Sequence, residues 1–209
     1  MIKAVVFDMD GVLIDAKEWH YDALNRALRL FGTEISRADH LTTFDGLPTK
    51  RKLELLSTTE NLPGALHGFL NELKQIYTME IVSVRCKPVF MHEMALSALK
   101  SRGVKLAVAS NSIRPTVEAM MSRARLTKYL DLMLSNQDVS RAKPDPEIYT
   151  LAMQRLGTSP DETLIVEDNE HGIRAARASG AHVLVVKSVQ DVNIANIDSR
   201  IAAIHGGAA

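Results

Sequence analysis

Residues 3–11 have the sequence KAVVFDMDG, a short apolar run that ends in two aspartates and a glycine. Four further apolar runs follow it along the chain, at residues 104–109 (VKLAVA), 130–134 (LDLML), 163–166 (TLIV) and 182–186 (HVLVV). Short runs rich in Val, Ile and Leu, without regular polar alternation, are typical of strands covered on both faces of a parallel sheet. The sequence therefore predicts five buried parallel strands.

Segments with helical spacing lie between these predicted strands. One of them is an apolar stripe with Asp145 placed to cap it, Pro146 in its first turn and Gly157 after its end. Its members are Ile148, Tyr149, Ala152, Met153 and Leu156. Strand and helix alternate from about residue 85 to residue 187, which predicts an α/β fold with right-handed crossovers.

Residues 16–84 break this alternation, because they have helical periodicity and no strand-like run. One expected helical stripe contains Trp19, Ala23, Ala27 and Leu30. A second contains Leu66, Phe69, Leu70, Leu73, Ile76 and Tyr77. We therefore predict a helical domain at residues 16–84, inserted into a core domain formed by residues 1–15 and 85–209.

The composition excludes several classes of protein. Among the 209 residues, 25 Lys and Arg balance 25 Asp and Glu, which excludes a strong electrostatic case for nucleic acid or an anionic membrane surface and leaves only a local basic patch open. The single cysteine, Cys86, excludes a disulfide within the chain and a cysteine-rich zinc site. No apolar run approaches the roughly 20 residues that span a bilayer. Asp8 interrupts any signal-type apolar region, so we expect a cytoplasmic protein.

The informative polar residues follow predicted strands, at the sheet edge where open α/β sheets bind ligands. Asp8 and Asp10 come directly after the first strand, and residues two apart in an extended chain point the same way. Paired carboxylates suit Mg²⁺, and they also suit a nucleophile beside a general acid and base. Taken alone, the pair is equally consistent with solvated acids at a strand end.

Three later clusters follow the same rule. Ser110 and Asn111 after the second strand suit a phosphate oxygen or an ordinary helix cap. Lys143, between a strand and a proline-started helix, presents a fixed positive charge or is a surface lysine in a turn. Glu167 and Asp168 suit a shared metal ion or the acidic start of a helix.

Together these clusters resemble the four motifs of the haloacid dehalogenase superfamily, in the same order. The motifs are FDMDGVL at 7–13, ASN at 109–111, AKPDP at 142–146 and IVEDNEHG at 165–172. The resemblance implies a Rossmann-like three-layer α/β/α core. The helical insert resembles the C1 cap of the subfamily that contains β-phosphoglucomutase and many small phosphatases.

The resemblance also implies roles for the motif residues. Asp8 would be the nucleophile that forms a phosphoaspartate, and Asp10 the general acid and base. Ser110, Asn111 and Lys143 would bind the transferring phosphoryl group. Mg²⁺ would be bound by Asp8, Asp10, Asp168 and Glu167. We further expect Mg²⁺ and Lys143 to keep the pKa of Asp8 low.

The choice among the reactions of the superfamily depends on Asp10 and on the cap. An alkoxide leaving group needs a proton, which Asp10 can supply, so phosphate esters are the favoured substrates. His20 matches a cap histidine of the β-phosphoglucomutase-like group, or it is a packed helix residue. That group grips a distal phosphate with a Lys-Gly-x-x-Arg segment, whereas this chain has Asp45 and Thr49 at the two basic positions, with Lys50 close by.

We therefore expect a Mg²⁺-dependent phosphatase for a small phosphorylated metabolite, with a sugar phosphate as the favoured candidate. A phosphosugar mutase is the enzymatic alternative, and a catalytically silent binding module is the other. One chain is expected to suffice, since all the motifs that build the site lie within it.

Overall fold

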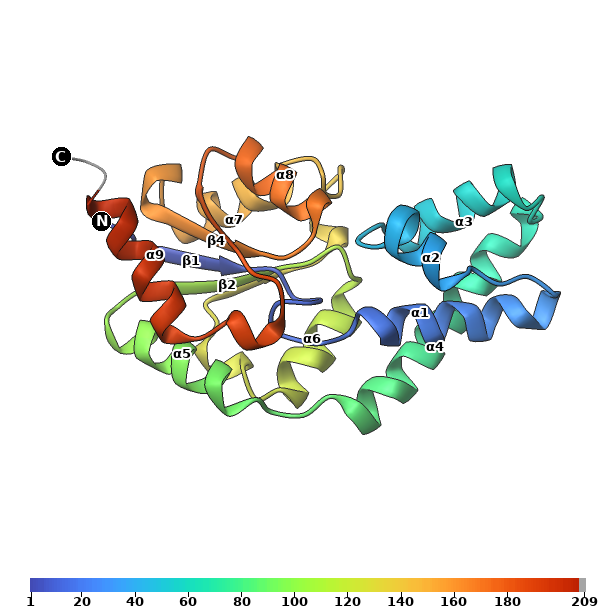
Figure 1. Cartoon of the computed structure of the whole chain (residues 1–209), viewed down its shortest axis with the longest axis horizontal. Helices are drawn as coiled ribbons and strands as arrows, with labels where there is room; N and C mark the ends of the chain where they lie inside the picture. Colours follow the sequence, from blue (N-terminus) through green and yellow to red (C-terminus); the bar gives the residue numbers. More distant parts are fainter. Residues whose placement is uncertain (207–209) are drawn as a thin grey trace. The chain divides into compact units, whose positions relative to one another are not determined.

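The computed structural model describes residues 1–206 of the chain (Figure 1). It divides into two compact units, one formed by Met1–Asp15 with Lys87–Ala209 and the other by Ala16–Cys86. We call them the core unit and the cap unit. The second junction thus lies two residues later than the sequence analysis placed it. Residues 207–209 of the predicted core domain lie outside the described part.

The core unit contains a five-stranded sheet in the order β3-β2-β1-β4-β5, and every neighbouring pair is parallel. Its strands are β1 (Ala4–Phe7), β2 (Lys105–Ala109), β3 (Leu132–Leu134), β4 (Thr163–Glu167) and β5 (His182–Val185). The predicted strands agree with these bounds to within two residues at each end. The loops after β1, β2, β3 and β4 therefore carry the four motifs at one edge of the sheet.

Strand β1 lies at the centre of the sheet and all four of its residues are buried. Ala4 pairs with Lys105 on one side and with Thr163 on the other. A strand with neighbours on both sides and helices on both faces has no solvent-facing side, which explains its unbroken apolar sequence.

Helices cover both faces of the sheet (Figure 1). Helices α7 and α8 lie on one face, and α5, α6 and α9 lie on the other. Their bounds are α5 (Phe90–Ser101), α6 (Arg114–Arg123), α7 (Glu147–Leu156), α8 (Glu170–Ala178) and α9 (Ile194–Gly206). The predicted three-layer α/β/α fold is confirmed.

The cap unit is helical. Its helices are α1 (Lys17–Leu28), the short α2 (Arg37–Asp39), α3 (Thr49–Thr59) and α4 (His67–Arg85). A π-helical turn at His40–Phe44 continues from α2. The apolar core of the unit includes Leu24 and Leu28 of α1, Leu53 of α3 and Leu70 of α4.

The predicted apolar stripes of the cap are wrong in part. Helix α4 buries Leu70, Lys74, Thr78 and Val82, which recur every four residues. Phe69 and Ile76 are instead 53% and 56% exposed, and Leu30 is 62% exposed. The buried face of α4 therefore contains a lysine and a threonine. The apolar spacing predicted Phe69 and Ile76 instead, and these two residues lie outside that face.

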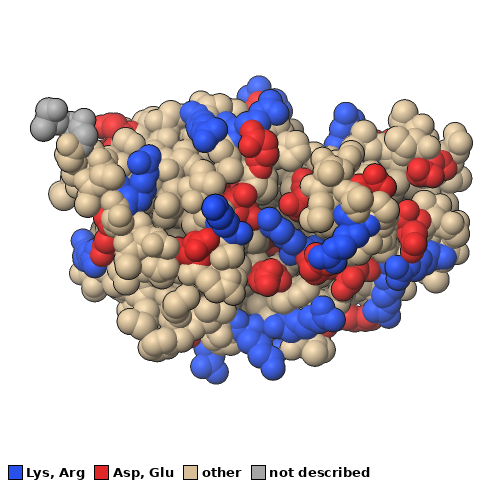
Figure 2. All heavy atoms as spheres, in the orientation of Figure 1, with Lys and Arg blue, Asp and Glu red and all other residues tan. Residues whose placement is uncertain are grey.

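The surface carries no single dominant charge on the face drawn in Figure 2, where Lys and Arg are interspersed with Asp and Glu. Within residues 1–206, no helix combines the length and the apolar character that a bilayer-crossing segment requires.

Candidate active site

The turn after β1 presents the first motif. The backbone N–H of Asp8 donates to the carbonyl of Val166 (2.9 Å), so the strand pairing with β4 continues to the first aspartate. Gly11 has a φ of 93°, a left-handed conformation that a residue with a Cβ rarely adopts. Its N–H donates to the carbonyl of Ile14 (2.7 Å) and closes the turn. The glycine thus lets the chain reverse directly after Asp10.

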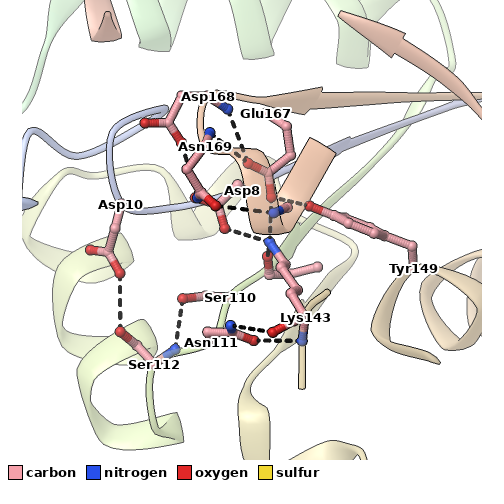
Figure 3. Close-up of polar contacts among 12 residues, drawn as sticks. Asp8, Asp10, Ser110, Asn111, Ser112, Lys143, Tyr149, Glu167, Asp168 and Asn169 are labelled. Carbon is pink, nitrogen blue, oxygen red and sulfur yellow. Dashed lines mark hydrogen bonds and ion pairs between the residues drawn. The ribbon is translucent and has the colours of Figure 1, made fainter. Parts of the chain in front are cut away.

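Lys143 lies at the centre of the site (Figure 3). Its ammonium donates to Asp8 Oδ1 (2.6 Å), to Glu167 Oε1 (2.7 Å) and to the carbonyl of Ala109 (2.9 Å). The residue is only 3% exposed. Lys143 therefore joins the ends of three strands, β1, β2 and β4, through one buried charge. Of the two interpretations that the sequence left open, the fixed charge applies and the surface lysine in a turn does not.

Glu167, the last residue of β4, is fully buried. Its Oε1 also accepts from the hydroxyl of Tyr149 (2.6 Å), and its Oε2 accepts from the N–H of Asp168 (3.0 Å). A Cβ at Gly172 would overlap this carboxylate, so only glycine lets the start of α8 approach Glu167 so closely. The carboxylate is consequently fixed by donors from three residues, Lys143, Tyr149 and Asp168.

Asn111 and Ser110 follow β2. The amide of Asn111 accepts from the N–H of Lys143 (3.1 Å) and donates to its carbonyl (3.4 Å). Ser110 is buried, and its hydroxyl oxygen accepts from the N–H of Ser112 (3.0 Å). The side chain of Asn111 thus holds the Lys143 loop against β2, a positional role that the sequence analysis did not assign.

Asp10 lies at the same edge of the sheet as Asp8, but its carboxylate has different neighbours (Figure 3). Its Oδ2 accepts from the hydroxyl of Ser112 (3.0 Å). Asp8 contacts Lys143, whereas Asp10 faces the segment after β2. The contacts described for the two carboxylates therefore differ, as the division of labour expected from the sequence would require.

Burial dominates the electrostatics of the site. It raises the pKa of Asp8 well above its usual value, and the charges of Glu167 and Asp168 raise it further against the opposing effect of Lys143. The pKa of Lys143 is raised despite burial, because Asp8 and Glu167 both favour its charged form. Lys143 alone therefore does not keep the pKa of Asp8 low. The low pKa that we expect for Asp8 requires a second cation beside it.

The residues around Asp8 fit a divalent cation. Asp8, Glu167 and Asp168 each offer a carboxylate oxygen, and these three oxygens lie within 4.8 Å of one another. Hard oxygen donors are the ligands that Mg²⁺ prefers in proteins. A cation between Asp8 and Asp168 would also supply the positive charge that ionisation of Asp8 requires.

The two cap candidates lie in different settings within the cap unit. Lys50 is exposed in the first turn of α3. His20 is half-buried in α1, and its Nδ1 lies 3.2 Å from the ammonium of Lys74. Lys74 and Lys52, at 6% and 7% exposed, are buried cap cations that the sequence analysis missed. The sequence feature that could have identified them is their position: each lysine falls at the same spacing as the buried residues of its helix.

The whole pattern matches one known family. The family described as "Haloacid dehalogenase-like hydrolase" matches residues 5–186, which include all four motifs and the helical insert. The chain belongs to this family. The sequence-based identification of the family, and of the chain as a phosphatase-type enzyme within it, is confirmed.

Individual relatives of this haloacid dehalogenase-like hydrolase span nearly its whole length. The phosphorylated carbohydrates phosphatase of Thermotoga maritima is 30% identical over 91% of this chain and 88% of its own. The phosphoglycolate phosphatase of Aquifex aeolicus is 29% identical over 86% and 82%. The crystal structure of β-phosphoglucomutase from Clostridium difficile superposes with a TM-score of 0.85 at 20% identity, over 97% of this chain and 98% of its own. The last likeness concerns the fold alone.

Proposed function

We propose that this protein is a Mg²⁺-dependent phosphomonoesterase that hydrolyses a small phosphorylated metabolite through a phosphoaspartate on Asp8. The observation that carries the proposal is the buried ammonium of Lys143, held 2.6 Å from Asp8 Oδ1. A fixed cation at this place neutralises a nucleophilic carboxylate and the incoming phosphoryl oxygens together.

The reaction has two balanced steps. In the first, a carboxylate oxygen of Asp8 attacks phosphorus while the ester P–O bond breaks, and Asp10 gives its proton to the leaving alkoxide. In the second, Asp10 takes a proton from water as that water attacks the phosphoaspartate. The bond between phosphorus and Asp8 then breaks, which releases inorganic phosphate and restores both aspartates.

The remaining motif residues bind and orient. Asp8, Asp168 and the backbone carbonyl of Asp10 would hold Mg²⁺, with Glu167 at the edge of that group. The ion would supply positive charge to Asp8 and to the phosphoryl oxygens. Ser110 would donate to a phosphoryl oxygen, and Asn111 would keep Lys143 in place through its backbone.

The substrate that we propose is a sugar phosphate or a similarly small ester. The name of the Thermotoga maritima relative, a phosphorylated carbohydrates phosphatase, supports this class. We assign the choice among such substrates to the cap unit, with His20 and Lys50 as the candidates from the sequence and Lys74 beside His20. The cytoplasm supplies such metabolites, and we propose that location for the enzyme, as a single chain.

Phosphate release from a panel of phosphorylated sugars, nucleotides and carboxylic acids tests the proposal. We expect release that requires Mg²⁺, stops with EDTA and falls at least about 10³-fold in Asp8→Asn. Isomerisation of a sugar phosphate without phosphate release would replace the phosphatase with a mutase. Folded protein that binds Mg²⁺ but converts nothing in either assay would favour a silent binding module.

A further inference from the structure

Tyr149 lies inside the active site but outside the four motifs. It belongs to the apolar stripe of α7, where the spacing predicts only a packed ring. The side chain is fully buried, and its hydroxyl donates to Glu167 Oε1 over 2.6 Å (Figure 3). Helix α7 begins four residues after Lys143, so the same short segment delivers both the lysine and this hydroxyl.

The oxygen that accepts from Tyr149 also accepts from Lys143. Glu167 Oε1 lies 2.6 Å from the Tyr149 hydroxyl and 2.7 Å from the Lys143 ammonium. Lys143 is in turn shared with Asp8 at 2.6 Å. The ammonium of Lys143 is therefore shared between two buried carboxylates, Asp8 and Glu167. Any other donor that hydrogen-bonds to Glu167 weakens its hold on the lysine, so that more of the lysine's charge interacts with Asp8.

The tyrosine contacts both partners in this competition. Its ring centroid lies 4.7 Å from Lys143 Nζ, so the aromatic ring packs beside the ammonium while the hydroxyl binds the carboxylate. A neutral hydroxyl satisfies a carboxylate lone pair without adding charge to the site. Phenylalanine would keep the ring contact and remove only this donor.

We propose that Tyr149 is a positioning residue of this reaction: its hydroxyl holds Glu167 so that Lys143 stays directed at Asp8 and the phosphoryl group. The inference rests on the proposed function, because it assigns a task to Lys143. A purely structural hydroxyl would stabilise the fold and leave the chemistry unchanged, and that difference can be measured.

Tyr149→Phe provides the measurement. With the hydroxyl gone, Glu167 draws Lys143 more strongly, and the lysine neutralises Asp8 and the phosphoryl group less well. We expect kcat to fall roughly 10- to 100-fold, as for other groups that orient a catalytic ligand, while KM rises no more than several-fold.

Thr163→Val is the matched control, because Thr163 is a fully buried hydroxyl at the opposite end of the same strand, β4. Its Oγ1 donates to the carbonyl of Ser159 (2.9 Å), away from the site. We expect a similar loss of stability and an unchanged kcat. Equal kinetics for Tyr149→Phe and Thr163→Val would overturn the proposal.

A double-mutant cycle identifies the route of the effect. In a Glu167→Gln background, Tyr149→Phe should change kcat less than about twofold, because the competition for Lys143 no longer exists. An undiminished effect in that background would also overturn the proposal.

Binding of inorganic phosphate with Mg²⁺, measured by calorimetry, separates failure of this inference from failure of the proposed function. Tyr149→Phe should bind phosphate several-fold more weakly than wild type and Thr163→Val, even if no ester is hydrolysed. Equal phosphate affinity in all three proteins would contradict the role of Tyr149 whatever their activity.

Discussion

The core unit and the cap unit both bury lysines, and the contacts described for these lysines differ. Lys143 in the core lies against two carboxylates and a backbone carbonyl. In the cap, the ammonium of Lys74 lies 3.2 Å from the imidazole of His20. Lys52 is near enough to His40 to lower the pKa of that imidazole.

The buried charge has a different role in the two units: in the core it stabilises buried carboxylates, whereas in the cap it lies beside imidazoles. Two buried carboxylates of fixed geometry need the ammonium of Lys143 for the stability of the folded protein, so the core site is organised before any ligand arrives. In the cap, burial lowers the pKa of the His40 imidazole and so favours its neutral form, which needs no neighbouring cation. The core is therefore expected to tolerate loss of its cation poorly, and the cap to tolerate it well.

The largest effect is expected for Lys143→Met. It leaves Asp8 and Glu167 buried without their shared cation, which costs about 3–5 kcal/mol of unfolding free energy and abolishes phosphate release. Lys74→Met in the cap should change the unfolding free energy by no more than about 1 kcal/mol, because methionine fills a similar volume. Urea denaturation at pH 7.5 measures both. Equal losses in the two variants would contradict the distinction between the units.

A smaller effect is expected for Gly172→Ala. Its new Cβ would overlap the Glu167 carboxylate, so either α8 or Glu167 must move, at about 1–3 kcal/mol and with a roughly 10²-fold loss of activity. The control is Gly68→Ala in α4, where nothing lies within 4 Å of the new Cβ. That change should stabilise the protein by about 0.4–1 kcal/mol, because alanine loses less backbone entropy on folding. Activity of Gly172→Ala close to that of Gly68→Ala would show that the contact is not required.

The smallest effect concerns His40, which is 2% exposed and whose pKa is lowered by burial and by Lys52. Below its ordinary pKa of 6.5 the unfolded chain takes up a proton that the folded protein resists. The unfolding free energy therefore falls as the pH drops from about 6.5 towards the folded pKa, by at most about 1.4 kcal/mol per unit of pKa difference. His40→Phe should reduce the loss of melting temperature between pH 7.5 and 5.5.

This measurement is made in metal-free buffer. Under that condition, acid changes the contribution of Asp8 to the unfolding free energy in the opposite direction. The folded pKa of Asp8 lies above its ordinary value of 3.8, so ionised Asp8 costs stability at neutral pH and that cost falls as the pH approaches the folded pKa. Asp8→Asn should accordingly be at least as stable as wild type at pH 7.5. Identical acid sensitivity of wild type and His40→Phe would contradict the assignment to the cap.

Sequence patterns located the core site because its residues are tied to the ends of strands. Once the five apolar runs are strands of one parallel sheet, Asp8, Ser110 and Asp168 must lie at the same edge. Lys143 follows from the third strand in the same way. The strand boundaries are sharp because an apolar run gives way directly to charged or polar residues.

The patterns failed for functional or buried side chains that do not lie at the end of a strand. Tyr149 was correctly expected in the buried stripe of α7, but its hydrogen bond to Glu167 joins residues 18 positions apart. In α4 the apolar residues Phe69 and Ile76 lie outside the buried face, which contains Lys74 instead. Analysis of apolar spacing assigns hydrophobic residues to the buried face, so it excludes a lysine from that face even when the lysine is buried.

The place of β1 in the sheet has a consequence for how the chain is made. Its Ala4 pairs with Lys105 and Thr163, which are synthesised roughly 100 and 160 residues later, or about 5–30 s at translation rates of about 5–20 residues per second. The central strand therefore leaves the ribosome long before either neighbour exists. The cap, continuous from Ala16 to Cys86, is complete in that interval and can fold from local helix contacts while β1, which precedes Asp8, still has no neighbouring strand to pair with.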